Sequence, residues 1–230
     1  SVMALRVPMT AMPQMVAVLN GFGGAASALV AGASVVESAL PDAQLGVPLA
    51  QLTAAASASG IIGAVTFWGS LVAFAKLQGI VGDNPLQVPF LHYINGVLLL
   101  VAIALGVMLV LNPTTLGYYW ALLVVASVVG LLLVIPIGGA DMPVVIALLN
   151  SYSGLAATAT GFVLNNNALI ITGSLVGASG IILTTIMCRA MNRSLRNVLF
   201  GVWVPAEAGP KAEDVYGGRI KATSPDEVAM

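Results

Sequence analysis

The chain is 230 residues long, 59% hydrophobic and only 7% charged, whereas soluble globular domains carry about 25% charged residues. This composition indicates an integral membrane protein. The formal net charge of -1 gives no basic face for nucleic acid, and that class of partner is excluded. Cys188 is the single cysteine, so the chain contains no internal disulfide and no cysteine-based metal site.

Six apolar runs are each long enough to cross a hydrocarbon core of about 30 Å, which needs about 20 helical residues. They contain no Asp, Glu, Lys, Arg or His, and they are continuous rather than alternating, so helices fit them better than strands. The sequence therefore predicts an all-α, polytopic membrane helix bundle. Its six transmembrane helices are expected over residues 13–36, 52–75, 93–111, 117–137, 143–164 and 168–188.

The first predicted span carries an asparagine in "MPQMVAVLNGFGG". Asn20 follows Pro13 by seven residues, which is about 10 Å along a helix and well inside the apolar layer. There the amide must face protein or a water-filled cavity. Its Gly and Ala neighbours are compatible with a packing hydrogen bond. Ser1 is not an initiator residue, so residues 1–12 are predicted to be a cytoplasmic segment or the end of a preceding helix.

The loops orient the bundle, because Lys and Arg concentrate on the cytoplasmic side of membrane proteins. The loops after the first, third and fifth spans contain no Lys or Arg. His92, the only histidine, is expected at the interface where the third span starts. Both ends of the chain are predicted to be cytoplasmic, together with the basic residues Arg6, Lys76, Arg189, Arg193 and Arg196.

The fifth predicted span follows the loop "IGGADMP", so Asp141 is expected on the cytoplasmic side. Asn150 also lies seven residues after a proline, but its neighbours are polar. Residues 150, 153 and 157 fall on one helix face. A functional polar lining around Asn150 and a simple packing role both fit this pattern. The sixth span offers hydroxyl partners for such a lining at Ser174, Ser179, Thr184 and Thr185.

The first and fifth spans share a pattern at a constant offset, which we interpret as a parallel internal repeat of spans 1–2 and 5–6. A weaker sequence similarity relates Gly63-Ala64 of the second span to Gly177-Ala178 of the sixth. Alternatively, Met-Pro merely starts a helix and the small residues merely pack. The main pattern pairs Met12, Pro13, Ala17, Leu19, Asn20, Gly24 and Ala26 with Met142, Pro143, Ala147, Leu149, Asn150, Gly154 and Ala156.

The composition changes after the sixth span, because most acidic residues of the chain lie in residues 205–230. The stretch "TSPDEV" has the form of a helix start, with Ser224 as N-cap and Pro225 at the first helical position. Residues 192–230 are therefore predicted to be a cytoplasmic linker, and residues 13–191 to be the membrane domain. We expect a soluble domain beyond Met230.

Several motifs are long enough to resemble a known family. "IPIGGADMPVVIALLNSYSG", "GSLVGASGIIL" and "IMCRAMNRS" occur in this order, and "MPQMVAVLNGFGG" and "GAVTFWGSLVAFAKLQG" precede them. Together they resemble the membrane domain of the beta subunit of proton-translocating NAD(P) transhydrogenase over nearly the whole chain. The resemblance implies a bacterial inner-membrane machine that couples reversible hydride transfer between NADH and NADP+ to proton passage.

The resemblance also implies cofactors and partners outside these helices. The beta subunit would continue into its own NADP(H)-binding domain, and an alpha subunit would carry the NAD(H) domain and further membrane helices. A homodimer of alpha-beta units is implied as well. The membrane part itself is expected to bind no cofactor and no metal, and it has no catalytic apparatus for hydride transfer.

Site residues can be assigned only where the motifs align. By resemblance, Asn150 is a helix asparagine implicated in proton translocation. Asp141 matches an acidic residue at the cytoplasmic entrance of the proton path. Many family members carry a histidine as candidate proton carrier where this chain has Asn20, so the carrier here stays open. We expect a proton path with Asn20, Asn150, Ser151, Ser153 and Ser179, and coupling to the NADP(H) domain through Asp141, Gly180, Arg193 and Arg196.

Two other functions remain open on the residues alone. A secondary transporter for a small solute would fit a parallel repeat with polar residues at mid-membrane. A structural anchor for a soluble enzyme domain would tolerate loss of Asn150 and Asp141. Because no ionisable residue lies in the predicted spans, proton passage would depend on water oriented by Asn, Ser, Thr and Tyr side chains, which donate and accept hydrogen bonds.

Overall fold

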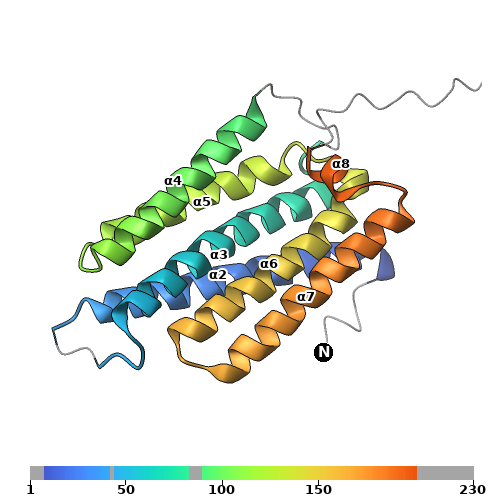
Figure 1. Cartoon of the computed structure of the whole chain (residues 1–230). Coiled ribbons are helices and arrows are strands. Elements are labelled where there is room, and N and C mark those ends of the chain that lie inside the picture. Colours follow the sequence, from blue (N-terminus) through green and yellow to red (C-terminus); the bar gives the residue numbers. More distant parts are fainter. Residues whose placement is uncertain (1–7, 42–43, 83–89, 201–230) are drawn as a thin grey trace, which may run out of the picture.

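The computed structural model describes residues 8–41, 44–82 and 90–200, and this part of the chain forms a helix bundle without strands (Figure 1). Six of its helices are long and apolar enough to cross a membrane, which confirms the predicted all-α membrane fold. The predicted helix start at "TSPDEV" lies outside the described residues. The six helices are α2 (Met12–Ser38), α3 (Leu49–Leu77), α4 (Leu91–Leu111), α5 (Gly117–Val134), α6 (Met142–Val163) and α7 (Asn167–Ala190).

Three short helices extend the predicted elements. The 3-10 helices η1 (Met9–Ala11) and η2 (Gly139–Asp141) lead directly into α2 and α6, whose first turns hold the prolines of the two Met-Pro pairs. The pyrrolidine ring presets the helical φ angle, so proline is well tolerated at that position. The helix α8 (Leu195–Phe200) lies within the predicted linker. Its Val198 is buried in the same cluster as Ile137 and Met142, so α8 packs against the end of the bundle.

The helix α3 occupies the middle of the bundle and packs against α2, α4, α5 and α6 (Figure 1). The helix α7 packs against α6, and α4 packs against α5, so α4 and α7 form opposite edges. The edge helices expose large apolar side chains such as Leu100 and Val107 on α4. A single-chain bundle with this apolar exterior suits a hydrocarbon environment.

Glycines allow the closest helix crossings. A Cβ atom added at Gly24 on α2 would lie 2.6 Å from the carbonyl oxygen of Gly63 on α3. Likewise, a Cβ atom at Gly154 on α6 would lie 2.5 Å from the backbone nitrogen of Gly177 on α7. Small residues permit such backbone contact in membranes, where packing drives helix association. The glycines of the proposed repeat thus lie at corresponding crossings, while the repeat itself stays a prediction.

Two boundaries differ from the predicted spans. The helix α5 ends at Val134 rather than at residue 137, because Pro136 has no N–H to continue the hydrogen-bond ladder. The helix α3 extends to Leu77 and thus includes Lys76 in its last turn. The predictions that Lys76 follows the second span and that no ionisable residue is buried in the spans are therefore wrong. Lys76 is only 2% exposed.

Candidate proton path and coupling site

Asn20 joins two helices that are far apart in the sequence. Its side chain is buried on α2, with 6% exposure, and its Nδ2 atom donates a hydrogen bond to the carbonyl oxygen of Ile146 on α6 over 3.2 Å. A buried amide without a partner would cost free energy, and this bond removes part of that cost. Asn20 therefore forms the polar packing contact that its sequence context allowed.

Asn150 lies one helical turn after Ile146 on the same side of α6, and its side chain is half-buried. Ser153 continues this face toward α2, since a Cβ atom added at Gly23 would lie 2.6 Å from the Ser153 hydroxyl oxygen. Among the described residues no hydrogen bond is formed by the Asn150 side chain. An amide at this depth needs polar partners, and ordered water can supply them.

Ser151 points to a different helix. It is fully buried and its hydroxyl donates to the carbonyl oxygen of Gly177 on α7 over 2.6 Å. Gly180 packs on the same residue, because a Cβ atom added there would lie 2.8 Å from Ser151 Cα. The structure thus brings Ser151 and Gly180 together at the crossing of α6 and α7. The Ser151 hydroxyl contributes to that crossing rather than to the Asn150 face.

Ser179 lies on the exposed face of α7, and its hydroxyl donates to Val176 of the same helix. It is not brought close to the polar face of α6 by any contact within the described residues. Thr184 and Thr185 also donate to carbonyl oxygens of their own helix. Of the four expected partners on α7, only Ser174 meets a hydroxyl of α6, that of Thr158 at 3.4 Å.

Asp141 and Arg193 form an ion pair at the end of the bundle. A guanidinium nitrogen of Arg193 donates to Asp141 Oδ2 over 2.8 Å. The turn after α7 fixes this approach, because Asn192 adopts a left-handed φ of 52° and the Arg193 N–H donates to the carbonyl oxygen of Cys188. Asp141 itself is buried, and its Oδ1 atom has no hydrogen-bond partner in the described part of the chain.

Lys76 holds the segment that leads to Asp141. Its Nζ atom donates to the carbonyl oxygens of Ile135 and Ile137, each over 2.6 Å. These carbonyls follow the last turn of α5, where the helix dipole favours a positive charge. The ammonium group therefore ties the end of α3 to the loop between α5 and η2. Its one signal in the sequence is a lysine directly after a long apolar run.

Among the polar residues that were not predicted as site members are the buried Ser70 and the half-buried Gln14. Ser70 on α3 packs on Gly21, next to Asn20, and its hydroxyl has no partner among the described residues. Gln14 on α2 donates to the carbonyl oxygen of Leu77 over 2.9 Å. Both are polar residues within predicted apolar spans, and this was the signal that could have found them.

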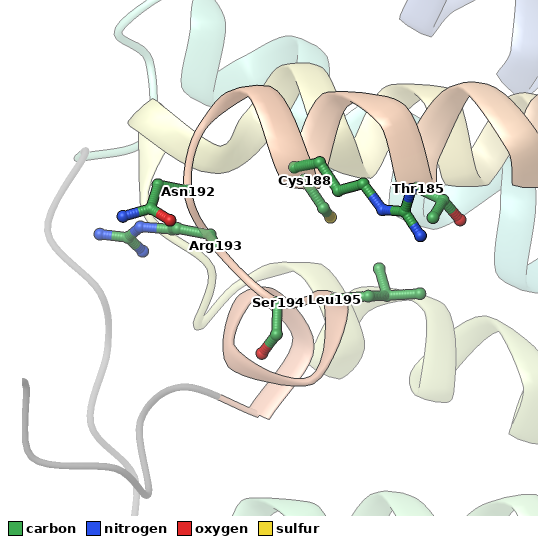
Figure 2. Close-up of a pocket in the computed structure, with 7 residues that line it drawn as sticks. Thr185, Cys188, Asn192, Arg193, Ser194 and Leu195 are labelled. Atoms are coloured by element: carbon green, nitrogen blue, oxygen red, sulfur yellow. The ribbon is translucent and has the colours of Figure 1, made fainter.

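The turn between α7 and α8 borders a cavity of about 480 Å³. Figure 2 shows Cys188 and Thr185 on the last turns of α7, and Ser194 and Leu195 at the start of α8. Arg193 belongs to the lining as well, whereas Arg196 is exposed on α8 outside it. The predicted coupling residues Asp141, Arg193 and Arg196 thus gather at one end of the bundle, while Gly180 lies at the helix crossing.

The fold and the site define a polytopic membrane protein whose helix bundle encloses polar side chains on α2, α3 and α6. Residues 1–230 match the family of the NAD(P) transhydrogenase beta subunit, and the chain belongs to this family. Two curated relatives from Rhodospirillum rubrum, one of them from a specified strain, are both named NAD(P) transhydrogenase subunit beta. Each is 43% identical to this chain over 232 residues.

These alignments cover 100% of this chain but 50% of each relative. The chain therefore spans about half the length of the curated relatives it matches. The family resemblance predicted from the motifs is confirmed over the full sequence.

Proposed function

We propose that this chain is the proton-translocating membrane part of a bacterial inner-membrane NAD(P) transhydrogenase. In this role it couples proton passage to hydride transfer between NADH and NADP+, which takes place in soluble domains. The observation that carries the proposal is the family match over the whole chain. The six apolar helices and the polar side chains between α2, α3 and α6 supply the physical setting.

The proton path runs between α2, α3 and α6. The amide of Asn20, the unpartnered hydroxyl of Ser70 and the half-buried Asn150 all lie at this helix contact or directly beside it. Amides and hydroxyls both donate and accept hydrogen bonds, so they orient water molecules without titrating themselves. Ser153 extends the face toward Gly23. The proton is carried by water along this line.

Ser151 and Ser179 have subsidiary places in this scheme. The bond from Ser151 to Gly177 holds α6 against α7 and thereby fixes the rotation of α6 that presents Asn150 to the path. Ser179 joins the path only if membrane helices of the alpha subunit cover the exposed face of α7.

Coupling takes place at the end that carries Asp141. The ion pair connects α6 to the segment after α7, which leads toward the NADP(H)-binding domain. Lys76 keeps the Asp141 loop on the end of α3, the helix that carries Ser70. A shift of the segment that carries Arg193 and Arg196 would thus act on the path through Asp141 and through the Gly180 crossing.

The cofactors and partners follow from the same proposal. NADP(H) binds to the beta subunit outside these helices, and NAD(H) binds to the alpha subunit. The alpha subunit adds further membrane helices, and two alpha-beta units form a dimer. The half of the curated relatives that this chain does not cover leaves room for the NADP(H) domain.

The two alternative functions are not favoured. A secondary transporter typically places its substrate at broken helices near mid-membrane. The six described spans are continuous helices. A structural anchor would leave the buried polar side chains between α2, α3 and α6 without a role.

The test is a vesicle assay of the complete alpha-beta enzyme that follows nucleotide reduction and internal pH together. We expect hydride transfer to change the internal pH, and an imposed pH gradient to change the rate of hydride transfer. A protonophore should abolish both effects. Hydride transfer without any pH change, at a rate independent of the gradient, would contradict the proposal and favour the anchor.

A further inference from the structure

The helices α2, α3 and α6 pack against one another (Figure 1), and a pair of hydroxyl groups lies where they meet. The Ser59 Oγ atom on α3 and the Thr160 Oγ1 atom on α6 are 2.8 Å apart, so one hydroxyl donates to the other. The carbonyl oxygen of Ser27 on α2 lies 3.1 Å from Ser59 Oγ and 3.4 Å from Thr160 Oγ1. Both hydroxyl residues are buried, and they connect all three helices at one point.

The hydroxyl pair lies on the helix faces that carry the proposed proton path. On each helix, a residue of the path is separated from the pair or its acceptor by seven or eleven positions, close to two or three whole turns. These residues are Asn20 and Ser27 on α2, Ser70 and Ser59 on α3, and Ser153 and Thr160 on α6. Seven helical residues span about 10 Å and eleven span about 16 Å. The three faces therefore lead from the path to the pair, farther along the bundle.

The predicted orientation places the pair in the half of the bundle away from the cytoplasm. The helix α6 ends on that side, and Thr160 lies three residues before its last residue, Val163. The helix α3 begins on that side at Leu49, ten residues before Ser59. A path that stopped at Ser153 would leave the outer part of this three-helix contact unassigned. The pair supplies buried polar groups there.

The hydrogen bond between the two hydroxyls can point in either direction. When Thr160 donates to Ser59, the Ser59 hydroxyl can donate to the carbonyl oxygen of Ser27. When Ser59 donates to Thr160, the Thr160 hydroxyl can donate to the carbonyl oxygen of Ala156 over 3.0 Å. A hydroxyl has one donor and two acceptor positions, so neither direction leaves a proton without a partner. A hydrogen-bond chain that conducts protons must reverse in this way after each transfer.

We propose, on the basis of the proposed function, that Ser59 and Thr160 form the outer section of the proton path. Water on one side gives a proton to one hydroxyl oxygen, and that hydroxyl passes its own proton to the second oxygen. The second hydroxyl then releases its proton to water on the other side. Each oxygen forms one O–H bond and loses one, so both hydroxyls are regenerated. Rotation of the two hydroxyls restores the starting direction.

The test follows internal pH during nucleotide reduction by the complete alpha-beta enzyme in vesicles. Thr160→Val keeps the shape of the side chain and removes its hydroxyl, while Ser59 keeps the carbonyl acceptor of Ser27. Thr160→Val should slow the pH change about tenfold, the effect of one lost hydrogen bond on a barrier. The ratio of the rates in H2O and D2O should rise, because proton transfer becomes the slowest step. Thr160→Ser restores the hydroxyl and should recover both quantities.

The matched control is Thr53→Val. Thr53 is also a fully buried threonine in the outer half, but its hydroxyl donates to carbonyl oxygens of its own helix, those of Leu49 and Ala50. This variant should keep the wild-type rate and the wild-type isotope ratio. Hydride exchange that requires no proton passage should be unchanged in every variant.

Slowing in Thr160→Val with recovery in Thr160→Ser and no change in Thr53→Val would support the outer section. Equal slowing in Thr160→Val and Thr53→Val would show general destabilisation and overturn it. Wild-type pumping and a wild-type isotope ratio in Thr160→Val would also overturn it, although the proposed function would still hold. A wild-type enzyme that leaves the internal pH unchanged would contradict the proposed function itself and the outer section with it.

Discussion

The guanidinium of Arg193 donates to the carboxylate of Asp141 over 2.8 Å and thereby connects the segment after α7 to the start of α6. The arginine side chain is half exposed, and ion pairs with this degree of exposure typically contribute about 0–1 kcal/mol to stability. The pair is therefore a weak determinant of folding. Its position between two segments makes it suited to transmit movement.

We predict that Asp141→Asn impairs proton-coupled turnover and alters NADP(H) affinity while the enzyme still assembles. The amide keeps the size of the side chain but loses the charge that attracts Arg193. Coupled turnover in vesicles and NADP(H) binding to the complete enzyme are the measurements. Arg193→Gln should produce similar losses, and the double variant should be no worse than either one, because both changes remove one interaction. Unchanged coupling and unchanged affinity would remove Asp141 from the mechanism.

We predict that Lys76→Met lowers both stability and coupled turnover. Methionine fills the space of the lysine stem but leaves the carbonyl oxygens of Ile135 and Ile137 without their donor. A buried acceptor that loses its partner costs about 1–3 kcal/mol. The melting temperature of the detergent-purified enzyme should fall. The ratio of coupled to uncoupled hydride transfer should also fall, because the Asp141 loop loses its support on α3.

Two control variants separate this coupling effect from general destabilisation. Lys76→Arg keeps the charge and the donors, so it should recover part of the coupling. Gln14→Leu removes a neutral bond to the neighbouring Leu77, and it should lower stability without changing the coupling ratio. Equal coupling ratios in Lys76→Met and Gln14→Leu would show that Lys76 serves stability alone.

The six spans could be predicted from the sequence because the hydrocarbon core requires runs of about 20 apolar residues, whatever their tertiary contacts. The burial of Lys76 could not, since a lysine after an apolar run is normally a solvated flanking residue. It becomes buried because α5 ends early at Pro136 and turns its last carbonyl oxygens toward α3. That geometry requires the ends of α3 and α5 to lie side by side, although the two helices are far apart in the sequence.

The candidate site was predictable in its residue types but not in its contacts. Helical spacing showed that positions 150, 153 and 157 share a face, but it could not show which neighbour that face meets. The rotation of α6 against α7 is set by close packing at Gly154 and Gly180. This rotation directs Ser151 to α7, and it leaves Ser179 on the outside. Asn20 and Ile146 meet only because α2 and α6 lie together in the fold.

We predict that Asn20→His is tolerated and adds a pH dependence to coupled turnover near pH 6.5, about the ordinary pKa of imidazole. The ring N–H can replace the donor to Ile146, and the second ring nitrogen supplies a titratable site. Asn20→Leu should impair turnover more than Asn20→Ala, because alanine leaves room for water. Proton pumping at several pH values is the measurement. A leucine variant that pumps normally would assign Asn20 to packing alone.

The remaining prediction concerns Asn150, whose half-buried side chain forms no hydrogen bond within the described residues. If it orients a water chain, Asn150→Leu should abolish proton translocation, since leucine neither donates nor accepts. Asn150→Asp restores a polar group and should keep part of the function. Hydride exchange that requires no proton passage should survive both changes, because that chemistry belongs to the soluble domains.

The matched control for Asn150→Leu is Asn95→Leu on α4. Asn95 is likewise an asparagine of a membrane span and is buried, but its amide donates to Leu132 on α5, away from the proposed path. Both variants lose an amide and gain an apolar side chain, and Asn95→Leu also loses the bond to Leu132, so it should lose at least as much stability as Asn150→Leu. Only Asn150→Leu should stop the change in internal pH during nucleotide reduction in vesicles. If both variants pump at the wild-type rate, Asn150 is a packing residue and the path does not follow α6.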